Sequence, residues 1–459
     1  MITEQLNHIC RQHQALLLEP GPNKLRIAVS SPPADALIQA LRFASQLPVE
    51  VEIWSPERVE KQRQLSVDSS SLPNDGDAIS ALDELFRRAI ERRASDIHIE
   101  PGANQSQIRL RIDGVLQPLP PINTQLTTAI SARLKVLAGL DIAERRMPQD
   151  GQLRCTVSGV DVSFRLSTLP CLYGETLVLR LQESQNQAST LDNLGIGNEQ
   201  LKVLRESLHQ PQGLILVTGP TGSGKTMTLY AALSELNHPG MNLCSVEDPV
   251  EIPMAGLNQV QINNRAGLTF QKVLRALLRQ DPDVIMIGEI RDNETATIAL
   301  NAAQTGHLVL STLHTNSTAE TLTRLNQMET PPWMVAAALK LIVAQRLVRR
   351  LCPHCRQRGT NDINLPPSLW PTSLPDWQPV GCEHCYSGYY GRLALFELMP
   401  ITTPLREAIL SKKSAGELTG LAVQMGMQSL WQCGFDAVQS GLTTLEEIWR
   451  VVGLPHGNA

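Results

Sequence analysis

The chain has 459 residues, which at about 150 residues per domain predicts roughly three domains. Charged residues make up 19% and hydrophobic residues 42%, a globular composition that excludes wholesale disorder, collagen and coiled-coil filaments. Forty basic and 45 acidic side chains give a net charge of −5, so the net charge of the chain does not attract nucleic acid.

The N-terminus does not resemble a targeting signal. Residues 1–14 carry Glu4, His8, Arg11 and His13 and have no apolar core, so they do not form a secretory signal. The most apolar stretch, 334–348, is interrupted by polar and basic residues and is shorter than the roughly 20 residues that a membrane span needs. We therefore expect a soluble, cytoplasmic protein whose association with a membrane is indirect, through a partner.

The first 190 residues predict two folded units and a linker. Residues 1–55 fit a short α/β unit, and the polar segment 56–77 reads as a linker because it cannot bury enough apolar area to offset its ordering entropy. From residue 78 an amphipathic helix precedes alternating strands and a hairpin turn at Asp113-Gly114. With a second helix over 126–140, this pattern predicts an α+β domain over 78–190.

From residue 191 the pattern changes to strand–loop–helix units. Apolar runs at 214–218 and 284–287 are typical of strands that are buried on both faces of a parallel sheet. Helical patterns cover 226–236 and 270–279. Residues 191–459 therefore predict a nucleotide-binding α/β domain.

A phosphate-binding loop lies between the first of these strands and its helix. Its eight residues fit G-x-x-x-x-G-K-[ST] and are Gly219, Pro220, Thr221, Gly222, Ser223, Gly224, Lys225 and Thr226. Backbone N–H groups of such a loop converge on phosphate oxygens, and the helix N-terminus adds positive potential. We expect Lys225 to neutralise the β- and γ-phosphates of ATP and the Thr226 hydroxyl to bind Mg²⁺.

Acidic residues and histidines follow the neighbouring strands. The 243–246 run leads into Glu247, Asp248 and Glu251, and the 284–288 run leads into Glu289. A carboxylate at the end of a buried strand beside a phosphate loop suits a Mg²⁺-linked acid or a base that orients water. His307 and His314 flank a third apolar run, and the spacing leaves open whether they are structural or sense the γ-phosphate.

Nine cysteines include two C-x-x-C pairs that are separated by 26 residues. In a chain of this length they favour a reducing compartment and one metal site over a disulfide scaffold. Cys352, Cys355, Cys382 and Cys385 suit tetrahedral Zn²⁺ in a structural role, and redox-active pairs are the alternative. Basic residues around the first pair predict a solvated face or a partner contact rather than a nucleic-acid site: Arg346, Arg349, Arg350, Arg356 and Arg358.

Four ordered motif blocks resemble the type IV pilus assembly and type II secretion ATPase family. They are the phosphate loop, VEDPVE at 246–251, LLRQDPDVIMIGEIRD at 277–292 and AAQTGHLVLSTLHTN at 302–316. RASDIHIEP at 93–101 and LDIAERRMPQDG at 140–151 resemble the family's preceding domain. The similarity covers roughly residues 78–450 and is closest to short assembly ATPases of gammaproteobacterial pilus operons.

The resemblance implies a fold and roles for individual residues. It implies a RecA-like P-loop domain preceded by a PAS-like α+β domain, with a zinc element at 350–395 and a helical C-terminal region at 397–459. Glu251 would orient or deprotonate the attacking water, Glu289 would act through Mg²⁺, and His307 and His314 would form a histidine box. Arg146 and Arg165 are our choices for phosphate contacts. Where the family often has QDGR, this chain has Gln152, so a phosphate contact there is not expected.

The resemblance also implies partners: a homohexameric ring at the cytoplasmic face of the inner membrane that drives a platform protein to add pilin subunits. The alternative function is a nucleic-acid-stimulated RecA-like translocase with a zinc element, which the net charge and the lack of interleaved aromatic residues disfavour. A nucleotide-gated binding module without hydrolysis is disfavoured by Glu251 and Glu289. The sequence does not distinguish a pilus from a secretion pseudopilus or a DNA-uptake fibre.

Overall fold

The computed structural model describes residues 78–182, 190–367 and 369–453 and, in the N-terminal region, Leu6, Cys10, 15–18, 24–30, 32–33, 35–45 and 47–54. The predicted linker at 56–77 lies outside the described residues. The chain divides into two compact units, of which the second begins for the most part at Leu181. No helix among these described residues is both long enough and apolar enough to cross a bilayer.

The N-terminal region folds as a small α/β unit. Its three-stranded sheet has β2 (Leu25–Val29) in the centre, antiparallel to β1 (Leu16–Leu17) and parallel to β3 (Val49–Ile53). Helix α2 (Asp35–Ser45) connects β2 to β3. The side chains of Leu25, Ile27, Leu37 and Leu41 are almost wholly buried in its core.

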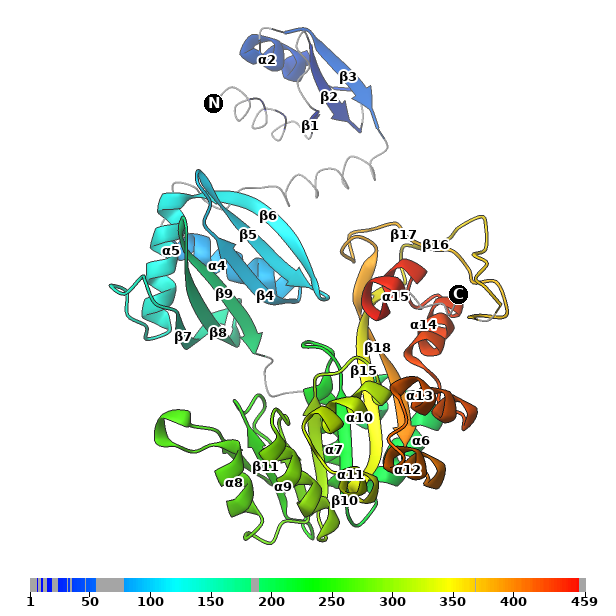
Figure 1. The fold of residues 1–459 in the computed structure, drawn as a ribbon. Helices are drawn as coiled ribbons and strands as arrows, with labels where there is room; N and C mark the ends of the chain where they lie inside the picture. Colours follow the sequence, from blue (N-terminus) through cyan, green and yellow to red (C-terminus); the bar gives the residue numbers. More distant parts are fainter. Residues whose placement is uncertain are drawn as a thin grey trace. The chain divides into compact units, whose positions relative to one another are not determined.

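Residues 78–182 form an α+β domain around a six-stranded sheet (Figure 1). The strand order is β6-β5-β4-β9-β8-β7. The elements in chain order are α4 (Ala78–Glu91), β4 (Ala94–Glu100), β5 (Gln105–Ile112), β6 (Val115–Asn123), α5 (Thr124–Leu137), β7 (Gln149–Val157), β8 (Val160–Cys171) and β9 (Gly174–Gln182).

The local sequence explains this domain well. Helix α4 buries Leu82, Leu85 and Phe86, the apolar positions of its helical period, and Phe86 stacks on Phe164 with ring centroids 4.7 Å apart. Asp113 and Gly114 both have positive φ, as a two-residue hairpin turn of this type requires.

The second unit is built on a seven-stranded sheet of order β12-β11-β13-β14-β10-β15-β18 (Figure 1). All neighbours are parallel except β18, which is antiparallel to β15. The strands are β10 (Gly213–Thr218), β11 (Leu243–Glu247), β12 (Leu257–Gln261), β13 (Val284–Ile287), β14 (Leu308–Leu313), β15 (Leu339–Leu351) and β18 (Tyr389–Pro400). Every residue of β10, β13 and β14 is buried, as expected for strands covered on both faces.

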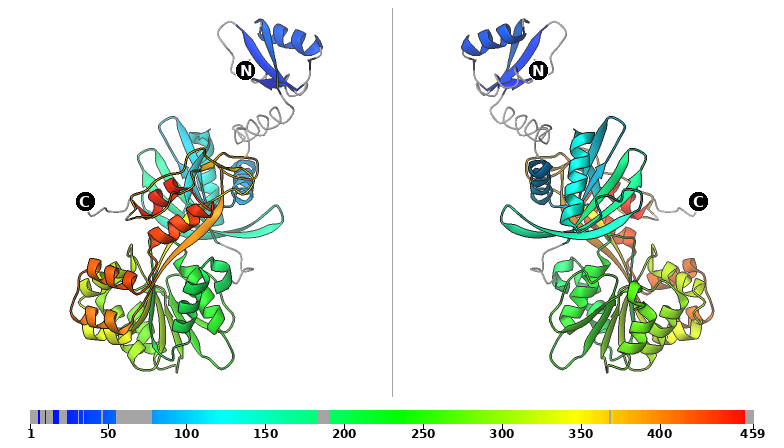
Figure 2. Two further views of the ribbon diagram at one scale, coloured as in Figure 1. Left: turned by 90° about the vertical axis from the view of Figure 1, so that its right-hand side faces the viewer. Right: turned by 90° about the vertical axis from the view of Figure 1, so that its left-hand side faces the viewer.

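Helices cover both faces of this sheet (Figures 1 and 2). Successive side chains of β10 point to opposite faces, so Leu214 and Leu216 pack in one core and Ile215 and Val217 in the other. The first core contains α8 (Phe270–Leu277), α9 (Asn293–Gln304), α10 (Thr318–Gln327), α11 (Pro332–Ala338), α12 (Thr403–Leu410) and α13 (Ala415–Gln424). The second contains α6 (Asn198–Leu208) and α7 (Lys225–Leu236).

The C-terminal part adds a knuckle and two helices around the extended β15–β18 pair. Between those strands lie β16 (Arg356–Arg358) and β17 (Trp377–Pro379), and after them come α14 (Leu430–Gln439) and α15 (Leu445–Val452). Glu447 of α15 has a completely buried side chain that accepts hydrogen bonds from Arg349 of β15 and from Arg450. This buried cluster fixes α15 to β15.

Candidate nucleotide site

The phosphate loop lies between β10 and α7, with the strand before it and the helix after it that its chemistry needs. Three of its residues, Gly219, Gly222 and Gly224, have positive φ, and a Cβ on Gly219 would approach Gln345 O and Ser223 Oγ to 2.5 Å. Ser223 Oγ is buried and has no hydrogen-bond partner among the residues that the structure describes. A tightly packed glycine loop with an unused hydroxyl donor fits a phosphate-binding site.

Lys225 and Thr226 begin helix α7. Lys225 is 8% exposed, and its ammonium donates to the carbonyl oxygens of Gly219, at 2.8 Å, and Pro220, at 3.1 Å. Burial lowers the pKa of Lys225 to about 8, with Glu289 opposing that shift and Arg346 adding to it. Thr226 is exposed at the helix N-terminus. Lys225 is therefore hydrogen-bonded to its own loop, at a position where phosphate oxygens would replace these two carbonyl oxygens.

Glu289 lies two residues after β13, at the carboxyl ends of the parallel strands, where the phosphate loop also lies. Its carboxylate accepts a hydrogen bond from Arg291, and its Oε2 lies 3.6 Å from Nε2 of His314. His314 follows β14 directly, and burial, reinforced by the charge of Lys225, lowers its pKa. The structure therefore brings Lys225, Glu289 and His314 together, and the lowered pKa of His314 favours its neutral imidazole.

The three carboxylates that follow β11 have different surroundings. Glu247 is buried and accepts hydrogen bonds from Tyr230, at 2.5 Å, and Ser245, at 2.6 Å, which marks it as structural. Val246 pairs with Ile287, so Asp248 and Glu289 each lie two residues beyond this pair. The hydrogen bond that Arg291 donates to Glu289 raises the pKa of Arg291, and the charge of Asp248 adds to that rise. Glu251 is exposed three residues further along the chain.

His307 lies at the opposite edge of the sheet from the phosphate loop. Strands β10 and β14 are parallel, with Gly213 opposite Leu308 and Thr218 opposite Leu313, so the loop and His314 share one edge. His307 precedes β14 and is roughly 20 Å from His314 along the strand. Its Nδ1 is 3.0 Å from Ala302 O, a contact that closes the turn between α9 and β14. Within one chain, the structure does not bring His307 to the site.

Arg146 and Arg165 both belong to the α+β domain and are exposed. Arg146, in the connection between α5 and β7, pairs with Glu144 at 2.9 Å, and that contact lowers the pKa of Glu144 to about 2 and raises the pKa of Arg146. Arg165 points outward from β8. Both guanidinium groups are accessible from solvent.

The middle of β15 supplies site residues that the sequence analysis missed. Thr218 pairs with Ala344, so Gln345 and Arg346 lie beside the start of the phosphate loop. The Gln345 side chain accepts a hydrogen bond from Thr228 of α7 at 2.7 Å. Arg346 is only 5% exposed, which contradicts its assignment to a solvated basic face. A basic residue within the apolar 339–348 run was the one available signal.

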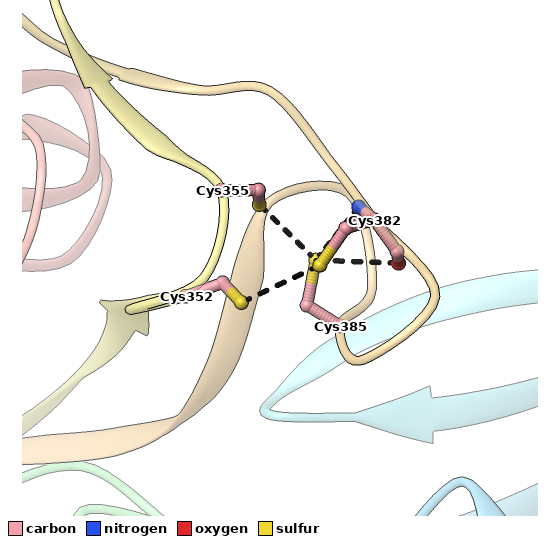
Figure 3. Close-up of side chains that lie close together, drawn as sticks. All are labelled: Cys352, Cys355, Cys382 and Cys385. Atoms are coloured by element: carbon pink, nitrogen blue, oxygen red, sulfur yellow. Dashed lines mark hydrogen bonds between the residues drawn. The ribbon is translucent and has the colours of Figure 1, made fainter. Parts of the chain in front are cut away.

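The four motif cysteines form one compact cluster (Figure 3). Cys352 and Cys355 follow β15, Cys382 and Cys385 precede β18, and all four sulfur atoms lie within 4.8 Å of one another. The Sγ separations are 3.7 Å for Cys352–Cys382 and 3.6 Å for Cys355–Cys385. A tetrahedron with Zn–S bonds of about 2.3 Å has edges of about 3.8 Å, so the cluster fits a structural Zn²⁺. All nine cysteines are free thiols.

Comparison with known proteins identifies the family of the chain. Residues 72–450 match the family described as "Type II/IV secretion system protein". The chain is 53% identical to the "Protein transport protein HofB homolog" of Escherichia coli, covering 99% of each chain. It is 40% identical to the "Type IV pilus assembly ATPase PilB" of Pseudomonas aeruginosa, covering 96% of this chain and 84% of that protein.

The fold agrees with the sequence comparison. The crystal structure of the pilus retraction motor PilT with bound ADP superposes with a TM-score of 0.54 at 28% identity, covering 82% of this chain and 97% of that one. The mainly parallel sheet, with β14 at its centre and β10 beside it, is accordingly a RecA-like ATPase fold. The chain is a P-loop ATPase, and it belongs to the Type II/IV secretion system protein family.

Proposed function

We propose that this protein is the ATP-hydrolysing motor of a type IV pilus assembly or type II secretion-like machine, working at the cytoplasmic face of the inner membrane. The observation that carries the proposal is the meeting of the phosphate loop, Glu289 and His314 at one sheet edge, in a chain 53% identical to a protein named for protein transport. The net charge of −5 favours protein partners over nucleic acid.

The phosphate loop would bind ATP through the backbone N–H groups of 219–226, with Lys225 on the β- and γ-phosphates. Thr226 and Glu289 would hold Mg²⁺, which when bound neutralises developing charge on the transferred phosphoryl group. His314, whose lowered pKa favours its neutral imidazole, would donate a hydrogen bond toward the γ-phosphate. His314 follows β14 and lies beside Glu289, which follows the neighbouring strand β13, and this position supports the role.

Glu251 would orient or deprotonate the attacking water. Its accessible carboxylate follows the same strand as Asp248, which like Glu289 lies two residues beyond the Val246–Ile287 pair. Asp248 is the second candidate for this role, because its charge acts on Arg291, which donates a hydrogen bond to Glu289.

Arg146 and Arg165 would contribute charge to a nucleotide site in a homohexamer. Both are exposed on the α+β domain, as such a contact requires. His307 would act across a subunit boundary, because within the chain it contacts Ala302 O before the start of β14, at the opposite end of that strand from His314. We further propose that residues 1–55, 78–190 and 191–459 act as separate units and that the α+β domain is PAS-like.

Zn²⁺ at the four cysteines would be structural. Four sulfur ligands close the coordination sphere and leave no position for a reacting water. The metal would fix the 350–395 segment at the ends of β15 and β18.

The test is to purify the tagged full-length chain from its own host and identify co-purifying membrane proteins. We expect a polytopic inner-membrane platform protein to co-purify, and we expect loss of surface or periplasmic pilin fibres when Lys225→Ala replaces the native chain. Lys202→Ala, a change of an exposed lysine on α6, is the matched control. ATP turnover that is stimulated by DNA, with strong salt dependence and no platform partner, would support the translocase instead.

A further inference from the structure

Arg346 is a buried charge next to the phosphate loop. It lies on β15, two residues past Ala344, which pairs with Thr218 at the end of β10. Its side chain donates from Nη2 to Asn316 O, at 2.8 Å, and to Asn316 Oδ1, at 3.2 Å. Nη1 donates to the carbonyl oxygen of Gln345 at 3.0 Å. The guanidinium therefore ties the turn after β14 to the strand beside the phosphate loop.

A second tie holds the same turn from the other side. Thr315 N donates to Thr218 Oγ1 at 3.0 Å, and the two hydroxyl oxygens lie 2.6 Å apart. Thr218 is the residue immediately before the phosphate loop. Residues 314–316 are thus held against β10 by Thr315 and against β15 by Arg346, and His314, the first of them, is the residue that faces Glu289.

The charge of Arg346 needs an explanation of its own, because a buried charge is costly and a neutral amide could make similar hydrogen bonds. Burial lowers the pKa of Arg346, while Glu320 of α10 and Glu397 of β18 oppose that shift. The charge of Arg346 also lowers the pKa of Lys225, and the charge of Glu289 opposes that shift. A fixed positive charge in a site of low dielectric is worth most where a polyanion binds and reacts.

We propose that Arg346 is a positioning residue for ATP hydrolysis, which fixes the 314–316 turn and adds permanent positive charge beside the bound phosphates. The proposal rests on ATP hydrolysis and not on any pilus partner.

The test compares Arg346→Lys, Arg346→Gln and, as control, Arg350→Gln in the full-length protein. Lysine keeps the charge but loses the forked contact with Asn316, so kcat should fall by roughly 10- to 100-fold while KM changes little. Glutamine also removes the charge, so KM for ATP should rise as well.

Nucleotide-binding stoichiometry and Tm separate positioning from folding. We expect both variants to bind one nucleotide per chain and the control to match the wild type in every measurement. Wild-type kcat in both Arg346 variants, or losses that follow only the fraction of chains able to bind nucleotide, would overturn the proposal. If Arg346→Gln does not fold, the kcat of Arg346→Lys decides.

Discussion

Nε2 of His314 lies 3.6 Å from Oε2 of Glu289, although 24 residues separate the two in sequence. The contact arises because β13 and β14 are parallel neighbours, with Ile287 opposite Ser311, and each residue follows the end of its strand. Lys225 faces the same carboxylate from the phosphate loop. The relationship gathers a lysine, an acid and a histidine where the strands β10, β13 and β14 end.

Nucleotide binding should take up a proton above pH 8. Burial holds the pKa of Lys225 at about 8 without nucleotide, and bound phosphates favour the charged ammonium, so they raise that pKa. Affinity should therefore be constant below pH 8 and fall by up to about tenfold per pH unit above it. Calorimetry of ATP binding in buffers of different ionisation enthalpy measures the proton uptake. Equal heats in all buffers at pH 9 would contradict this account.

Substitutions of the two proposed catalytic acids should abolish turnover without abolishing binding. Glu289→Gln removes the charge that faces His314 and Arg291, and we expect kcat to fall at least about 100-fold, with ATP affinity changed only a few-fold. Glu251→Gln should behave similarly if it orients water. The control is Glu294→Gln, an exposed residue paired with Arg275 on α8. Wild-type kcat in Glu251→Gln would transfer its role to Asp248.

Removal of zinc should loosen the segment between β15 and β18. We expect one Zn²⁺ per wild-type chain by elemental analysis and its loss in Cys382→Ser, because three thiolates leave the tetrahedron incomplete. Limited proteolysis within 350–395 should then become faster. Cys171→Ser, a change of an exposed cysteine in the α+β domain, should leave both measurements unchanged. A metal-free wild type, or equal protease resistance with and without metal, would refute the structural zinc.

The buried Glu447 should contribute strongly to stability. Burial alone would raise its pKa, but hydrogen bonds from Arg450 and Arg349 lower it, so its contribution is present above the unfolded pKa and is lost as pH falls through the lower folded value. Glu447→Gln leaves Arg349 without its charged partner and should cost about 3–5 kcal/mol, measured by thermal unfolding at pH 7. Glu446→Gln, an exposed neighbour, is the control. A variant whose Tm equals that of the control would show that the ion pair contributes little.

Local features of this fold could be predicted from the sequence, and features set by strand order could not. The phosphate loop, the Asp113-Gly114 turn and the face of α4 depend on residues close in sequence. His307 and His314 flank one apolar run alike, and only the parallel register with β10 shows that one of them is at the loop and the other at the far edge.

Arg346 escaped prediction for a related reason. Its neighbours Arg349 and Arg350 suggest a basic surface, whereas the β10–β15 pairing buries Arg346 beside the phosphate loop. The apolar run at 334–348 likewise divides into α11 and β15, a division that the composition of the run does not reveal. The cysteine pairs were predictable because two C-x-x-C knuckles carry their own metal geometry.

The most direct test of the central claim is the steady-state rate of ATP hydrolysis by the purified full-length protein before and after Lys225→Ala. The account predicts that turnover falls at least about 100-fold, because the ammonium that would neutralise the β- and γ-phosphates is gone. Turnover at the wild-type rate in Lys225→Ala would contradict the account.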